Sequence, residues 1–134
     1  MASTTIEGLA IASCGLLVIG AAFQFGLGAG APWGHAAYGG RAALADGRLP
    51  GRHRVVSLIT AVVLVGVGWV LLLRGGVVGS VSENPALSVA CWGFAGLFAL
   101  NTAANVAGRH PLERWGMGAL TGSLSVLCAL LAVG

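Results

Sequence analysis

The chain has 134 residues, of which 57% are hydrophobic and only 8% are charged, and its formal net charge is +3. A soluble domain carries about 25% charged residues, so this composition excludes an ordinary water-soluble fold. The length predicts one domain. All seven basic residues are arginines in or beside short segments between apolar stretches. We therefore expect membrane lipid as a partner, and no nucleic acid.

Four apolar stretches are each long enough to cross a bilayer as a helix, which takes about 20 residues. Only helices let an open chain satisfy all its backbone hydrogen bonds within lipid. The sequence therefore predicts an all-α fold, a four-helix transmembrane bundle formed by residues 1–134, in a multi-pass protein of the cell membrane. The expected spans cover residues 6–30, 55–73, 86–106 and 115–133.

The arginines predict the orientation of these spans. Six of the seven lie between the first and second spans or between the third and fourth, and only Arg74 lies elsewhere. Arginine-rich loops usually stay in the cytoplasm. We therefore expect both termini on the outer side of the membrane.

Polar side chains are concentrated near the arginine-rich loops. Gln24 lies in the last part of the first span, and Asn101 and Asn105 lie one helical turn apart in the third, so these two share a face. Polar groups within a membrane usually face the interior of a bundle or a cavity. Two interpretations stay open: the amides join helices by hydrogen bonds, or they orient a ligand.

The segment Gly30–Gly40 follows the first span and carries two aromatic residues, a histidine and four glycines, but no formal charge. It is predicted either to form a wall or lid of a pocket or to be an interfacial turn anchored by Trp33 and Tyr38. Together with polar and aromatic residues of the spans, it supplies the candidate substrate-binding residues. These are Trp33, Tyr38, Gln24, Asn101, Asn105, His110, Trp115 and Phe98.

Two carboxylates are candidate catalytic acids. Glu113 lies between Pro111 and Trp115, where it either complements the dipole at a helix start or acts as a general acid held between apolar walls. Asp46 lies in an Ala-Asp-Gly-Arg turn, which is also typical of a solvated loop. No histidine or cysteine pair has the spacing of metal ligands, so we expect no metal and no cofactor.

Small residues predict close helix contacts. Gly26 and Gly30 are four residues apart in the first span, and Gly118 and Gly122 are four apart in the fourth, which favours close approach of neighbouring helices. Proline, tryptophan and glycine also recur near the ends of the first and third spans. A duplicated pair of helices would produce this repeat, and so would interfacial chemistry or chance.

Several short motifs resemble a family of small four-span membrane proteins of high-GC Gram-positive bacteria, which mostly have no assigned role. The motifs are Gly30-Ala31-Pro32-Trp33-Gly34, Gly39-Gly40-Arg41, Leu49-Pro50 and Glu113-Arg114-Trp115. The chain is also similar in size and character to non-classical terpene cyclases, which open an epoxide or protonate an alkene. The resemblance implies a membrane-bound, metal-independent isomerase or lyase of terpenoid biosynthesis, acting on an apolar isoprenoid-like substrate in the cytoplasmic half of the bilayer.

Two other functions stay open. The alternative to an enzyme is a non-catalytic membrane subunit or scaffold. It also resembles the small multidrug resistance exporters in its four spans, but those depend on a carboxylate deep in the first span. Here Glu7 lies at the end of that span and its interior holds only Gln24. An exporter would also require a homo-oligomer, which the sequence leaves open.

Overall fold

The computed structural model describes all 134 residues and contains four long helices and no strand. Leu112–Met117, labelled η3, forms a π-helical turn that leads directly into the last helix. Four helical segments, with Leu112–Val133 taken as one, are each long and apolar enough to cross a membrane. The all-α, four-helix prediction is thus confirmed. The long helices are α1 (Ser3–Ala29), α2 (Gly51–Arg74), α3 (Pro85–Val106) and α4 (Gly118–Val133).

Local chemistry explains where these helices begin and end. α1 stops at Gly30, whose left-handed φ of 99° lets the amide of Ala31 turn back onto the carbonyl of Gly26. Asn84 is the N-cap of α3, and its side chain accepts a hydrogen bond from the amide of Ala86 at 2.9 Å. Pro85 occupies the first helical position, where its missing amide hydrogen costs nothing.

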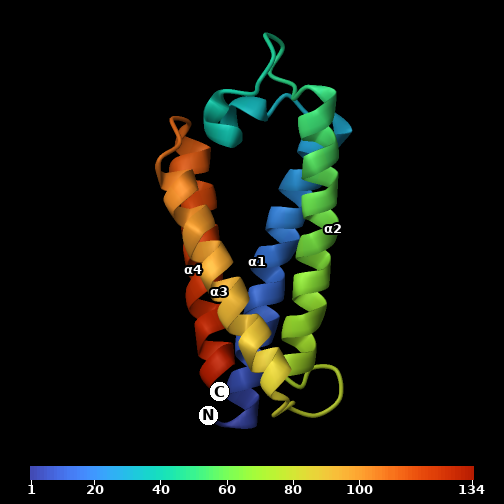
Figure 1. Cartoon of the computed structure of the whole chain (residues 1–134), viewed down its shortest axis with the longest axis vertical. Helices are drawn as coiled ribbons and strands as arrows, with labels where there is room; N and C mark the ends of the chain where they lie inside the picture. Colours follow the sequence, from blue (N-terminus) through green and yellow to red (C-terminus); the bar gives the residue numbers. More distant parts are fainter.

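The helices form two pairs, α1 with α2 and α3 with α4 (Figure 1). The pairs meet at the end of the bundle that carries both termini and residues 75–84, which we call the terminal end. They diverge towards the opposite end, where residues 30–50 cross from one pair towards the other. We call these residues the lid, and this end of the bundle the lid end.

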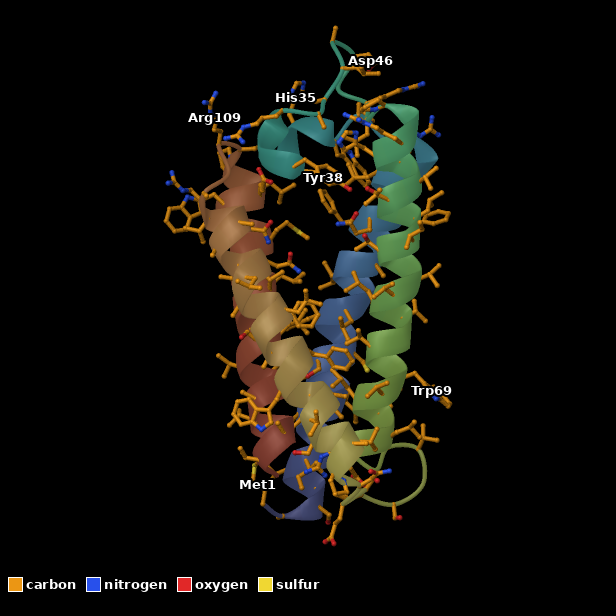
Figure 2. The ribbon with its side chains drawn as sticks, viewed as in Figure 1. Met1, His35, Tyr38, Asp46, Trp69 and Arg109 are labelled. Carbon is orange, nitrogen blue, oxygen red and sulfur yellow. The ribbon has the colours of Figure 1, made fainter.

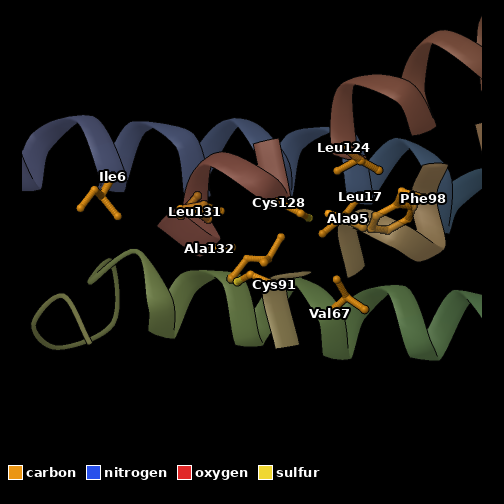
Figure 3. Packing of buried hydrophobic residues seen from close by; sticks show 12 residues of the cluster. Ile6, Leu17, Val67, Cys91, Ala95, Phe98, Leu124, Cys128, Leu131 and Ala132 are labelled. Atoms are coloured by element: carbon orange, nitrogen blue, oxygen red, sulfur yellow. The ribbon is translucent and has the colours of Figure 1, made fainter. Parts of the chain in front are cut away.

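The solid core of the bundle occupies its terminal half. Buried side chains from all four helices pack there in one cluster, part of which Figure 3 shows from close by. At the lid end only a small cluster is buried, formed by Leu27, Ala37 and Leu49 beneath the lid. The larger cluster consists of Ile6, Ala10, Leu17, Val67, Leu71, Cys91, Ala95, Phe98, Leu124, Cys128, Leu131 and Ala132.

The outer surface of the helices is apolar. Large aliphatic side chains such as Val18, Val62 and Leu100 point outwards and are more than half exposed. Monomeric soluble proteins rarely expose apolar surface on this scale, whereas a bilayer would cover it.

Hydrogen bonds between helices reinforce each pair. In the α3–α4 pair, the Thr102 hydroxyl lies 2.9 Å from that of Thr121, and the Ser125 hydroxyl donates to the carbonyl of Ala95 at 2.8 Å. In the α1–α2 pair, Nε of Arg54 donates to the carbonyl of Gly28 at 2.9 Å. Each pair is therefore held by polar contacts of its own.

The lid is a folded segment rather than an extended linker. It contains two 3₁₀ turns, η1 (Gly34–Ala36) and η2 (Tyr38–Gly40). The amide of Gly34 donates to the carbonyl of Gly47 at 2.8 Å, which ties the two arms of the lid together.

Candidate functional site

A cavity of about 450 Å³ lies between the helix pairs at the lid end, and all four helices contribute to its wall. Its volume is within the range of ligand pockets, roughly 300–1,000 Å³. Residues 36–39 of the lid form part of the wall, and Arg41 adds a guanidinium group. Figure 2 shows Tyr38 at this end of the molecule, between the two helix pairs.

Glu113 is the one acidic residue in the wall of this cavity. Its side chain is buried, with only 4% of the residue exposed. Oε1 accepts a hydrogen bond from the backbone amide of Gly39 at 2.8 Å, whereas Oε2 is buried without a partner. The only ion pair in the chain joins Arg48 and Asp46, so no cation neutralises Glu113 directly. Oε2 is therefore a buried oxygen whose hydrogen-bonding capacity the chain leaves unused.

Two local features place this carboxylate. The π-helical turn η3 carries Glu113, and such turns are frequent at functional sites because they redirect side chains. Gly108 lies directly against the carboxylate, and a Cβ atom there would overlap Oε2.

The lid supplies the donor for this contact by means of a left-handed backbone. Tyr38, Gly39 and Gly40 have φ values of 53°, 67° and 73°. Glycine adopts this conformation freely, but Tyr38 does so at a cost of about 1–3 kcal/mol. The run turns the amide of Gly39 towards Glu113, so the lid and the α3–α4 pair are joined by a hydrogen bond to the candidate acid.

Amide side chains line the opposite walls of the cavity. Gln24 on α1 and Asn101 on α3 both contribute to the wall, and each lies five residues before the end of its helix, at Ala29 and Val106. Oε1 of Gln24 is buried without a partner. Asn105 also lines the cavity, but its Nδ2 donates to the Thr121 hydroxyl at 3.3 Å. Asn105 therefore both joins helices and faces the cavity.

The aromatic part of the cavity wall comes from Phe23, Tyr38 and Phe98. The Tyr38 hydroxyl lies 3.2 Å from the hydroxyl of Ser57 on α2, and its ring meets the edge of His53 with the centroids 5.1 Å apart. These contacts hold the phenol of Tyr38 against α2 at the mouth of the cavity.

Four residues predicted for the site do not line the cavity. Trp33 stacks on Phe23 with the ring centroids 6.0 Å apart and fills the space above Gly26 on the side of α1. Trp115 is 69% exposed and points away from the bundle, with the Arg114 guanidinium 5.8 Å from its ring centroid.

The other two are engaged at the surface. Nδ1 of His110 accepts a hydrogen bond from the amide of Leu112 at 3.2 Å, at the start of the π turn. Asp46 lies at the exposed tip of the lid, 3.8 Å from Nε of Arg48 (Figure 2). The structure thus brings Gln24, Tyr38, Phe98, Asn101, Asn105 and Glu113 together around one cavity, and it places Asp46, Trp33, His110 and Trp115 outside it.

The cavity wall also contains residues that the sequence does not mark as candidate site residues, including Arg41, Thr60, Met117 and Thr121. Thr121 lies eight positions after Glu113, so a helical face through Glu113 would have suggested it. Arg41 belongs to the arginine-rich loop and to the Gly39-Gly40-Arg41 motif, and neither pattern indicates that its side chain lines a cavity. No group of three or more His, Cys, Asp or Glu side chains is arranged to hold a metal ion.

A second hollow, of about 640 Å³, lies along the α1–α2 pair. Its wall is almost entirely apolar and includes Val18, Phe25, Val62 and Trp69. These side chains are exposed on the outside of the bundle. The hollow therefore lacks the polar groups that would orient a ligand.

No protein-family model, curated protein or solved structure matches this chain.

Proposed function

We propose that the chain is a multi-pass protein of the cell membrane, with both termini on the outer side and the lid end in the cytoplasm. Its four long apolar helices support the membrane location. The orientation is supported by the arginines, because six of the seven lie in the segments at the lid end. The cavity then opens within the cytoplasmic half of the bilayer.

The function that the cavity supports best is an enzyme acting on an apolar isoprenoid-like molecule, with Glu113 as general acid. The observation that carries this proposal is the buried oxygen Oε2, which has no partner and belongs to a side chain in the cavity wall. Most buried polar atoms are hydrogen-bonded, so an unpaired one at a cavity is a reason to look for a ligand. Asp46 lies outside the cavity, and the proposal therefore assigns the acid to Glu113 alone.

The proposed reaction is acid-initiated terpenoid cyclisation, in keeping with the resemblance to small membrane-bound terpene cyclases. Glu113 donates a proton to an epoxide or alkene of the substrate, and the electron pair of a neighbouring double bond forms the new ring bond. The resulting carbocation loses a proton from an adjacent carbon, and that proton returns to the carboxylate, so the net change is an isomerisation. Phe23, Tyr38 and Phe98 offer aromatic faces to the cation.

The test uses purified protein in lipid nanodiscs and β-farnesene epoxidised at its terminal double bond, so that the epoxide is the only oxygen of the substrate. Glu113→Gln keeps an oxygen that can accept from Gly39 but removes the acid. Because general acids contribute about 10²–10⁴-fold to rates, turnover should fall at least about 100-fold. Asp46→Asn is the matched control and should retain the wild-type rate. Equal turnover by wild type and Glu113→Gln, or none by any form on a series of epoxidised prenyl substrates, would refute the proposal.

A non-catalytic subunit or scaffold is the second candidate, and the hydrogen bond between Gly39 and Glu113 favours it. In that case Glu113 holds the lid against the α3–α4 pair and has no chemical role. Glu113→Ala would then lower the thermal stability and Glu113→Gln would preserve it, with no turnover in any form. Together, the two variants distinguish a structural role of Glu113, as the contact that holds the lid, from a catalytic role as general acid.

A further inference from the structure

The wall of the cavity changes in character from the lid end towards the core. Gln24, Asn101 and Glu113 supply polar groups in the part nearer the lid. Leu17, Leu64 and Leu124 line the same cavity at a greater depth. On α1, Leu17 lies about two helical turns deeper than Gln24. On α2 and α4, Leu64 and Leu124 lie about one turn deeper than the polar residues Thr60 and Thr121. A ligand that satisfies both regions has a polar end and an apolar end.

Phe98 lies where the cavity meets the solid core. It lines the cavity, yet only 2% of its surface is exposed and it belongs to the large buried cluster. Figure 3 shows Phe98 beside Leu17 and Ala95, at the end of that cluster opposite Ile6. One and two turns before Phe98 in α3, nearer the terminal end, Ala95 and Cys91 are buried in the core and do not line the cavity. The cavity therefore ends at the ring of Phe98.

We infer that the cavity takes a single-tailed amphiphile with its tail towards the core and its oxygen-bearing end beneath the lid, and that Phe98 determines the length of tail it accepts. This inference rests on the proposed isoprenoid-like substrate and adds its orientation and size limit. Gln24 and Asn101 lie at corresponding depths on α1 and α3, so their amides flank the polar end of the ligand. Glu113 faces that same end, which places the reacting group there.

The size limit follows from close packing. Protein cores leave few voids larger than a water molecule, so a tail that reaches Phe98 has no further room in the wild-type chain. Phe98→Ala removes the ring and extends the deep end of the cavity between Leu17 and Leu124. Additional tail carbons then leave the mouth of the cavity and enter an apolar space, which improves their binding.

Binding can be measured without turnover. Native mass spectrometry of the protein released from detergent micelles counts bound geraniol, farnesol or geranylgeraniol per chain and gives a dissociation constant for each. For wild type we expect a preferred tail length, with a weaker constant for the longer alcohol. Phe98→Ala should shift the ratio of dissociation constants about tenfold or more towards the longer tail, as expected when extra carbons gain a fitting pocket. Phe25→Ala removes the same ring from the outer surface of α1 and should leave the ratio unchanged.

The outcomes separate this inference from the proposed function. An unchanged ratio in both Phe98→Ala and the milder Phe98→Leu, each verified as folded by circular dichroism, would overturn the role of Phe98 and leave the role of Glu113 intact. Binding with the expected shift but without turnover would refute the proposed enzymatic function and leave the inferred orientation of the tail intact. If wild type binds none of the three alcohols, this inference is refuted.

Discussion

Gly39 links the lid to the candidate acid through the amide hydrogen that it donates to Glu113. Its φ of 67° lies in the left-handed region, and no atom lies closer than 4.0 Å to the position of an added Cβ. Gly39→Ala should therefore destabilise the protein by conformation alone, by about 1–2 kcal/mol. Thermal unfolding in detergent micelles, followed by circular dichroism, measures this effect.

Gly66 provides the matched control. It lies inside α2 with open space around an added Cβ and an ordinary φ. Gly66→Ala should leave stability unchanged or raise it by about 0.5–1 kcal/mol, because alanine favours a helix interior. If the two substitutions have equal effects, the left-handed turn does not carry the cost assigned to it.

Single residues also show which parts of the site the sequence could predict. Gln24, Asn101 and Asn105 were predictable because polar groups within apolar helices tend to face an interior. The sequence predicts Trp33 at the site because it belongs to the aromatic-rich segment Gly30–Gly40. In the structure the lack of a side chain at Gly26 lets the Trp33 ring lie on the flank of α1, against Phe23. That outcome depends on how the lid folds, which residue types alone do not specify.

Two arginines each stabilise the end of the preceding helix by donating a hydrogen bond to one of its last carbonyl groups. Nε of Arg54 donates to the carbonyl of Gly28 at the end of α1. Arg54→Ala should lower stability by about 1–2 kcal/mol, since it removes a charged donor from a partly buried carbonyl. Arg52→Ala, two residues earlier on an exposed part of α2, should change stability by less than about 0.5 kcal/mol. Chemical denaturation in micelles gives both values, and equal losses would show that Arg54 acts only through its charge.

Arg114 caps the second pair in a similar way, since its Nε donates to the carbonyl of Val106 at 2.9 Å. In both pairs the second helical segment follows a proline, Pro50 or Pro111, and supplies an arginine to the end of the first. The Pro, Trp and Gly residues that recur in the sequence include Pro32 rather than Pro50, so the arginine capping is a separate similarity between the two pairs.

The four helices were predictable because composition requires them, but their boundaries depend on local chemistry. α2 begins at Gly51 rather than near Val55, so Arg52 and Arg54 are helical. The fourth helical segment begins at Leu112 rather than near Trp115, through the π turn that carries Glu113. A hydrophobic period of 3.6 residues contains no signal for a π turn, so the burial of Glu113 could not be derived from it.

At the scale of the whole molecule, the bundle is packed in one half and hollow in the other. The terminal half closes over the large buried cluster. The lid half leaves a cavity between diverging pairs, with the lid across their ends. Hydrophobic pattern predicts that both halves are helical, but it does not distinguish a filled interior from a cavity, because the same small and apolar residues serve both.

The proposed topology can be tested by labelling, because both termini lie at one end of the bundle and the lid lies at the other. Ser3 and Asp46 are exposed at these two ends, whereas Cys91 and Cys128 are buried. A membrane-impermeant maleimide added to intact cells should therefore label Ser3→Cys at once and Asp46→Cys only after permeabilisation. Wild type under the same conditions gives the background from its native cysteines. Labelling of Asp46→Cys before Ser3→Cys would reverse the orientation and place the lid and its arginines outside, against the charge pattern that predicts them inside.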